Sequence, residues 1–287
     1  MIRLLAAVAA IALAASAQAQ DAPPPSLAAR NAAVDLPIAA PARAPDWADE
    51  FDTPGLPDPA KWAYDTAWNK QGWFNDEKQY YAADRPENAR VEDGTLLITA
   101  RHEALTKAKD YGGQAYTSAR LLTRGHAQWT HAFVEVRARL ACGRGVWPAI
   151  WMLGADDRAG WPAQGEIDIM EHVGWDEGVV HGTIHTKAYN HVAGTQVGAQ
   201  TRLADACTAF HTYQLDWTRD RLLIGVDGRA YMRFDNDGKG EAASWPFDRP
   251  EFLILNVAVG GWGGQQGIDD TAFPATMAVD YVRVWER

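Results

Sequence analysis

The chain has 287 residues, of which 47% are hydrophobic and 22% are charged, and its formal net charge is −10 at pH 7. This length and composition suit a globular protein with one large domain or two small ones. The acidic charge and the lack of a Lys/Arg run argue against nucleic acid or an anionic membrane surface as a partner, whereas a neutral polymer would not be repelled.

The first residues have the layout of a secretory signal peptide. Arg3 is followed by a short apolar run and then by the small-x-small site Ala17-Gln-Ala19. This run is too short and wrongly flanked for a membrane anchor, and no other apolar stretch is long enough to cross a bilayer. We therefore expect residues 1–19 to be removed and the protein to be exported to the periplasm or beyond, free of the membrane.

The segment that follows differs in composition from the rest of the chain. Residues 20–45 are rich in Ala and Pro with little periodicity, which predicts a tether that does not pack against the domain. No second Pro/Gly linker divides the remainder. Residues 46–287 are therefore expected to form one domain.

Short segments with strand chemistry recur along this domain. Many alternate between apolar and polar residues, Asp227-Gly228 suits a hairpin turn, and no convincing amphipathic helix of three turns or more occurs. The expected strands span residues 95–99, 133–140, 179–185, 213–217, 221–226, 229–234, 252–259 and 277–285. This pattern predicts an all-β sandwich or jelly roll of two antiparallel sheets, one of which offers a concave face to a ligand.

Only two cysteines occur, Cys142 and Cys207, and their spacing fits neither a metal finger nor a redox motif. Because an exported protein matures where disulfides form, we expect a Cys142–Cys207 bridge. Two separate buried thiols are the alternative.

The stretch Gly165-Glu-Ile-Asp-Ile-Met-Glu-His172 places three acids at an irregular spacing. On a strand Glu166 and Asp168 share one face, but Glu171 breaks the alternation by one residue. On a helix Glu166 and Glu171 would lie roughly 140° apart around the axis, so the acids could not converge. A strand with a β-bulge at Met170 or its neighbour would turn all three acids to one face, and bulges are common beside active sites.

Carboxylates that face each other across a groove can hydrolyse a glycosidic bond. We assign Glu166 as nucleophile, Glu171 as acid/base with a pKa raised by burial and like charges, and Asp168 as the group that tunes the ionisation of Glu166. Acids on one short strand fit the separation of roughly 5 Å found in retaining enzymes. The chain also has 13 tryptophans, many beside Gly, Asn or Gln, and such flat faces suit stacking on sugar rings.

A metal site is the competing interpretation of this region. His181 and His185 would share one strand face, but His172 alternates away from Glu171, and no Cys or further His completes a tetrahedral set. We interpret His185 instead as a hydrogen-bond donor in the groove.

These residues resemble glycoside hydrolase family 16, in particular its bacterial laminarinase-like endo-β-1,3-glucanases, from about residue 47 to residue 287. The most specific match is Glu166-Ile-Asp-Ile-Met-Glu171, which fits the family's bulged E-x-D-x-x-E signature. Further similar segments span residues 72–80, 116–120, 143–153, 182–185 and 255–261. The resemblance implies a concanavalin-like β-jelly roll and a retaining, double-displacement mechanism that needs no cofactor.

The resemblance also implies roles for other residues. Groove contacts are implied for Trp73, Asn75, Glu77, Arg120, Trp147, Trp151, His185 and Trp262. The match at Trp262 is weaker than at Trp147 or Trp151, because its glycine-rich segment is one residue shorter than in many relatives. Many relatives hold a structural calcium on the convex side, and Glu50, Gly94 and Asp280 match its ligand positions.

We therefore expect a monomeric, retaining endo-β-1,3-glucanase that acts on a neutral β-glucan. Two alternatives stay open at this point. The substrate could be another polysaccharide, such as mixed-linkage β-1,3-1,4-glucan, agarose or a galactan. The protein could also be a non-catalytic β-glucan-binding protein, although proteins of that kind lose the acids that this chain retains.

Overall fold

The computed structural model describes residues 34–287, in which the regular elements are β-strands and short 3-10 turns. The expected signal peptide, residues 1–19, lies outside the described residues. Between residues 34 and 287 no helix is long and apolar enough to span a membrane.

The larger sheet has eleven strands in the order β1-β16-β15-β14-β9-β18-β6-β7-β4, with β2 paired to β18 and β5 paired to β6. Neighbours are antiparallel except for the parallel pair β4 and β7. The strands are β1 (Leu36–Pro37), β2 (Trp47–Asp49), β4 (Gln79–Tyr81), β5 (Ala89–Glu92), β6 (Thr95–His102), β7 (Tyr116–Ser118), β9 (Ala132–Arg139), β14 (His211–Trp217), β15 (Arg221–Val226), β16 (Arg229–Asp235) and β18 (Ala275–Glu286).

The smaller sheet has seven strands in the order β13-β12-β11-β10-β17-β8-β3. They are β3 (Ala63–Tyr64), β8 (Arg120–Leu122), β10 (Val146–Gly154), β11 (Glu166–His172), β12 (Val179–His185), β13 (Val197–Arg202) and β17 (Glu251–Val259). The 3-10 turns are η1 (Phe74–Asp76), η2 (Asp157–Ala159), η3 (Gly261–Gly264) and η4 (Asp270–Ala272).

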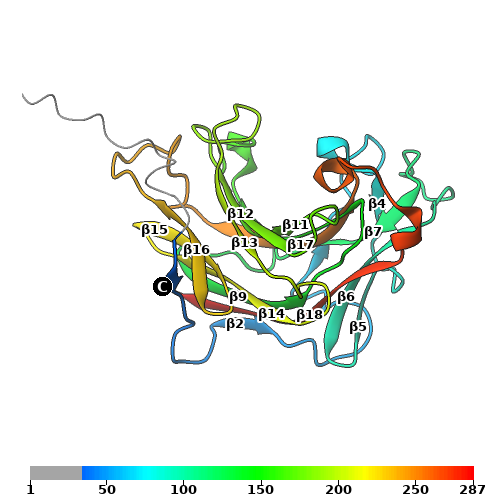
Figure 1. The fold of residues 1–287 in the computed structure, drawn as a ribbon, viewed down its shortest axis with the longest axis horizontal. Helices are drawn as coiled ribbons and strands as arrows, with labels where there is room; N and C mark the ends of the chain where they lie inside the picture. The colour runs from blue at the N-terminus through cyan, green and yellow to red at the C-terminus, as the bar shows by residue number, and fades with distance from the viewer. Residues whose placement is uncertain (1–33) are drawn as a thin grey trace, which may run out of the picture.

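The two sheets stack face to face, and loops rise on both sides of the smaller sheet's outer face (Figure 1). The main core lies between the sheets and draws on alternating residues such as Val134 and Val136 of β9. Strand β17 is buried along its whole length, as the mainly apolar sequence of residues 252–259 predicts. The all-β jelly roll expected from the sequence is therefore confirmed.

The predicted tail of residues 20–45 is wrong for the part that the structure describes. Leu36 pairs with Ala230 in β16, and Ile38, only 4% exposed, packs with Phe133 and Trp285. The physical reason is that two apolar residues at positions i and i+2 meet an otherwise unpaired strand edge, where backbone hydrogen bonding and apolar burial both become available. The packed domain thus includes residues before position 46.

The predicted disulfide is confirmed. Cys142 and Cys207 are joined, with their Cα atoms 5.8 Å apart. The bridge ties the segment before β10 to the segment between β13 and β14.

Candidate active site

A β-bulge in β11 gathers the three acids. In the pairing of β10 with β11, Ile150 opposes Met170 and Trp151 opposes Asp168, so Ile169 is the extra residue. Because the bulge adds one residue after Asp168, Glu171 points to the same face as the other two acids. Glu166, Asp168 and Glu171 therefore all line one groove. The predicted bulge is confirmed, with Met170's neighbour as the inserted residue.

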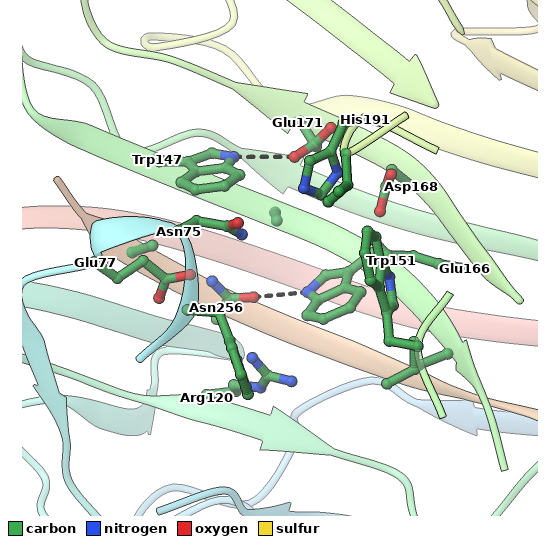
Figure 2. Close-up of a pocket in the computed structure, with 16 residues that line it drawn as sticks. Asn75, Glu77, Arg120, Trp147, Trp151, Glu166, Asp168, Glu171, His191 and Asn256 are labelled. Carbon is green, nitrogen blue, oxygen red and sulfur yellow. Dashed lines mark hydrogen bonds between the residues drawn. The ribbon is translucent and has the colours of Figure 1, made fainter. Parts of the chain in front are cut away.

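The groove lies on the outer face of the smaller sheet and has a volume of about 510 Å³. Strands β8, β10, β11 and β17 form its floor, and loops and η1 supply its walls. Its lining comprises Phe74, Asn75, Glu77, Arg120, Trp147, Ala149, Trp151, Leu153, Trp161, Glu166, Asp168, Glu171, His191, Val192, Asn256 and Ala258. Figure 2 shows the indole rings of Trp147 and Trp151 facing the acids of β11.

Two tryptophans donate hydrogen bonds to the outer acids. Trp161 Nε1 lies 2.6 Å from Glu166 Oε2, and Trp147 Nε1 lies 3.1 Å from Glu171 Oε1. Burial, followed by the charge of Asp168, raises the pKa of Glu166 to about 8. Burial and the charges of Asp168 and Glu166 raise the pKa of Glu171 well above its ordinary value. This shift favours the protonated form of Glu171, which a general acid needs.

Asp168 lies between the two glutamates along the strand and is only 3% exposed. Burial raises its pKa to about 7, and a hydrogen bond between the carboxyl groups of Glu166 and Asp168 links the two ionisations. Because two negative charges this close repel each other strongly, Glu166 and Asp168 share one proton. His185 Nε2 stands 3.4 Å from Asp168 Oδ2.

Most of the residues implied by the resemblance line the same groove. Asn75 and Glu77 come from η1 and the residue after it, Arg120 from β8, and Trp147 and Trp151 from β10. The guanidinium of Arg120 lies 4.7 Å from the ring centroid of Trp151. This cation–π contact holds the guanidinium of Arg120 against the aromatic face of Trp151 on the groove floor.

The structure does not bring Trp73 into the groove. Its indole is buried, donates a hydrogen bond to Asn69, packs edge-on against Tyr81 and supports Arg120 from behind. The expectation of a direct groove contact from Trp73 is therefore wrong, because every face of its ring is occupied by protein.

Two other implied contacts also lie outside the groove lining. His185 is buried behind the acids at 6% exposure and reaches Asp168. Trp262 packs edge-on against Trp147 and His181, beside the acid/base end. Both therefore act on groove residues and not on the groove surface.

The positions expected to hold calcium carry other partners. Both carboxylate oxygens of Glu50 accept hydrogen bonds from Arg283, and Asp280 accepts one from Arg137. Gly94 occupies a turn with φ of +71°. Because guanidinium groups already neutralise both carboxylates, the residues present do not fit a calcium ion.

Several groove residues were not singled out from the sequence. Trp161, five residues before Glu166 in the loop that leads into β11, is the donor to Glu166, and Phe74 and His191 line the walls. Asn256 Oδ1 accepts from Trp151 Nε1 at 2.7 Å, and its Nδ2 donates to Tyr81. A lone Asn in the apolar run of β17 was a usable signal for Asn256, whereas nothing local marked Trp161 apart from the other exposed tryptophans.

Comparison with known proteins agrees with this geometry. The model of Glycosyl hydrolases family 16 matches residues 76–283. A beta-glucanase of Rhodothermus marinus is 55% identical over 247 residues, covering 83% of this chain and 84% of that protein. A glucan endo-1,3-beta-glucosidase of Cryptopygus antarcticus is 37% identical, covering 84% of this chain and 91% of that protein. The crystal structure of SCLam, a non-specific endo-beta-1,3(4)-glucanase, is 64% identical with a TM-score of 0.86, covering 88% of this chain and 95% of that chain.

Proposed function

The chain belongs to glycosyl hydrolases family 16, and we propose that it is a retaining endo-β-1,3-glucanase that cleaves β-glucan by double displacement. The observation that carries this proposal is the bulge at Ile169, which turns three acids of one strand toward one groove. A strand without the bulge would point Glu171 into the core.

In the first step Glu166 attacks the anomeric carbon while Glu171 gives its proton to the leaving glycosidic oxygen. The C–O bond to the leaving chain breaks, and a bond forms between the anomeric carbon and Glu166. Attack needs Glu166 ionised, so in the reactive form the proton that it shares with Asp168 resides on Asp168. Trp161 stabilises the carboxylate before attack.

In the second step Glu171, now a carboxylate, takes a proton from water as the water attacks the anomeric carbon. The bond to Glu166 breaks, and the sugar leaves with its original β configuration. Glu171 is protonated again and the cycle closes. No cofactor takes part, because the two glutamates and water supply every proton and electron pair.

The substrate class follows from the lining of the groove. Trp147, Trp151 and Trp161 offer aromatic faces to sugar rings, and Asn75 and Asn256 offer polar groups to hydroxyls. Among the residues that line the groove in the described part of the chain, Arg120 is the sole Lys or Arg, which favours a neutral glucan over a sulfated polymer. Because a 64% identical neighbour is a non-specific endo-beta-1,3(4)-glucanase, we also propose mixed-linkage glucan as a second substrate.

The proposal extends to location and assembly. The layout of residues 1–19 and the Cys142–Cys207 bridge support export to an oxidising compartment. We propose that the exported protein acts there as a monomer, free of the membrane.

Time-resolved proton NMR of the anomeric signals during laminarin cleavage tests the function. We expect the β-anomer to appear first and then to mutarotate. Early α-anomer would contradict retention, and no new reducing ends on laminarin or mixed-linkage glucan would overturn the assignment. Glu166→Ala is the control, since it should keep the fold and abolish turnover.

A further inference from the structure

Three side chains at the nucleophile end of the groove bring potential metal ligands together. Glu166, Asp168 and His185 each offer one ligand atom, and these atoms all lie within 4.8 Å of one another. We infer that they form a site for a zinc-type divalent cation, and that the bound ion inhibits the enzyme by occupying the nucleophile.

The ligand types and spacing suit zinc. Zinc accepts imidazole and carboxylate ligands, and an open zinc site combines three protein ligands with a water in the fourth position. Two ligands that are each about 2.1 Å from a tetrahedral ion lie about 3.4 Å apart. Asp168 Oδ2 and His185 Nε2 are already separated by 3.4 Å. The Glu166 oxygen lies within 4.8 Å of both atoms, so a shift of this side chain by at most an ångström or two would complete the set.

Unused polar atoms at the same place support a ligand. Asp168 Oδ2 is buried and has no hydrogen-bond partner in the part of the chain that the structure describes. A buried carboxylate oxygen left without a partner is costly, and a cation would relieve that cost. The ion would replace the proton that Glu166 and Asp168 share, so no new charge is left uncompensated.

The ion should be held reversibly and not as a permanent part of the protein. When His185 Nε2 binds a metal, its proton lies on Nδ1, and that atom has no partner among the described residues. Metal-binding histidines usually donate this second N–H to an acceptor, and loss of that contact typically weakens binding 10- to 100-fold. Zinc would therefore compete with substrate and leave on chelation.

A second cluster with ligand spacing does not offer the same chemistry. Cys142, His172 and Cys207 also lie together, but the disulfide occupies both sulfur atoms. The groove cluster contains no such covalent bond between its ligands, and because it includes Glu166, an ion bound there is expected to affect function.

Calorimetric titration of Zn²⁺ into the untagged full-length protein tests binding directly. We expect one equivalent per chain, with at least a tenfold loss of affinity in His185→Ala. His126→Ala is the matched control, because His126 is exposed and lies outside the cluster, and it should bind zinc like wild type. Thermal melting of each variant without metal checks folding, and His185→Gln replaces the alanine variant if that one fails to fold.

Two titration results would overturn the site: no binding to wild type, or equal binding to His185→Ala and wild type. Mg²⁺ should bind far more weakly than Zn²⁺, because an imidazole ligand favours zinc.

The inhibitory effect rests on the proposed function and is tested by laminarin kinetics. Inhibition that is competitive and reversed by EDTA supports it, and bound zinc without inhibition contradicts it. Because calorimetry needs no turnover, an enzyme inactive on laminarin would refute the function without affecting the test of the site.

Discussion

Replacing Trp161 with phenylalanine isolates the hydrogen bond to the nucleophile. Trp161 Nε1 donates to Glu166 Oε2 at 2.6 Å, and this hydrogen bond lowers the pKa of Glu166 against the larger effect of burial. Trp161→Phe keeps an aromatic ring and removes the donor. The pKa of Glu166 should therefore rise, and the acid limb of the activity profile should move to higher pH.

The size of the effect follows from the type of bond. Hydrogen bonds to charged groups contribute about 1.5–3 kcal/mol, and the lower end applies because Trp161 is 40% exposed. A loss of about 1.4 kcal/mol is tenfold in rate. On the acid side of the profile, where the ionised fraction of Glu166 limits the rate, kcat/KM should fall about 10-fold. At the optimum the loss should be smaller, because most of Glu166 is ionised there.

The assay is kcat/KM on laminarin as a function of pH. Trp68→Phe is the matched control, since Trp68 is 43% exposed and packs edge-on against Phe74, and its indole donates no hydrogen bond among the described residues. Its profile should follow that of wild type. An unchanged acid limb in Trp161→Phe would refute the reasoning, and so would an equal loss at every pH, which would point to sugar stacking as the role of the ring.

Three further predictions concern groups around the site and the fold. Asp168→Asn removes the negative charge that helps to raise the pKa of Glu166. The acid limb of kcat/KM on laminarin should therefore move to lower pH, which is the opposite of the shift expected for Trp161→Phe. A shift to higher pH would contradict the coupling between the two carboxyl groups. Replacing Cys142 and Cys207 with serine opens a 65-residue loop and should cost about 4 kcal/mol of the free energy of unfolding in urea titrations, whereas a cost below about 1 kcal/mol would argue against the bridge. Glu251 is fully buried with neither oxygen partnered among the described residues, and burial raises its pKa well above the ordinary value. Because the pKa of Glu251 is higher in the folded protein than in the unfolded one, the stability of wild type should fall as pH rises from the unfolded pKa through the folded one. Glu251→Gln has no ionisable group at this position, so it should show a higher Tm than wild type at neutral and alkaline pH. Equal Tm values there would contradict the assignment.

The sequence predicts the fold best where one strand carries its own signal. The alternation in β9 and the apolar run of β17 depend on which faces are buried, and that information is local. Strand β1 could not be found in this way, because two residues carry no periodicity and their pairing depends on β16, almost two hundred residues away. Which strands become neighbours is likewise a property of the whole chain.

The site was predictable to the extent that its chemistry lies on one strand. Glu166, Asp168 and Glu171 could be assigned to one face because their spacing violates the strand period by a single residue. The tryptophans were harder, since Trp73 and Trp161 both lie in loops with similar neighbours. Packing alone decides that Trp73 supports Arg120 from behind while Trp161 reaches Glu166.

The short strand β1 has a consequence beyond its small contribution to the core. Residues 34–38 hydrogen-bond along Gly228–Tyr231 and so cover the first part of the edge of β16. A bare sheet edge is a template on which another chain can add a strand, and proteins commonly protect such edges. A chain begun at residue 46 would keep every groove residue and still leave this edge uncovered. Self-association, and not loss of activity, is then the expected cost of trimming the N-terminal segment.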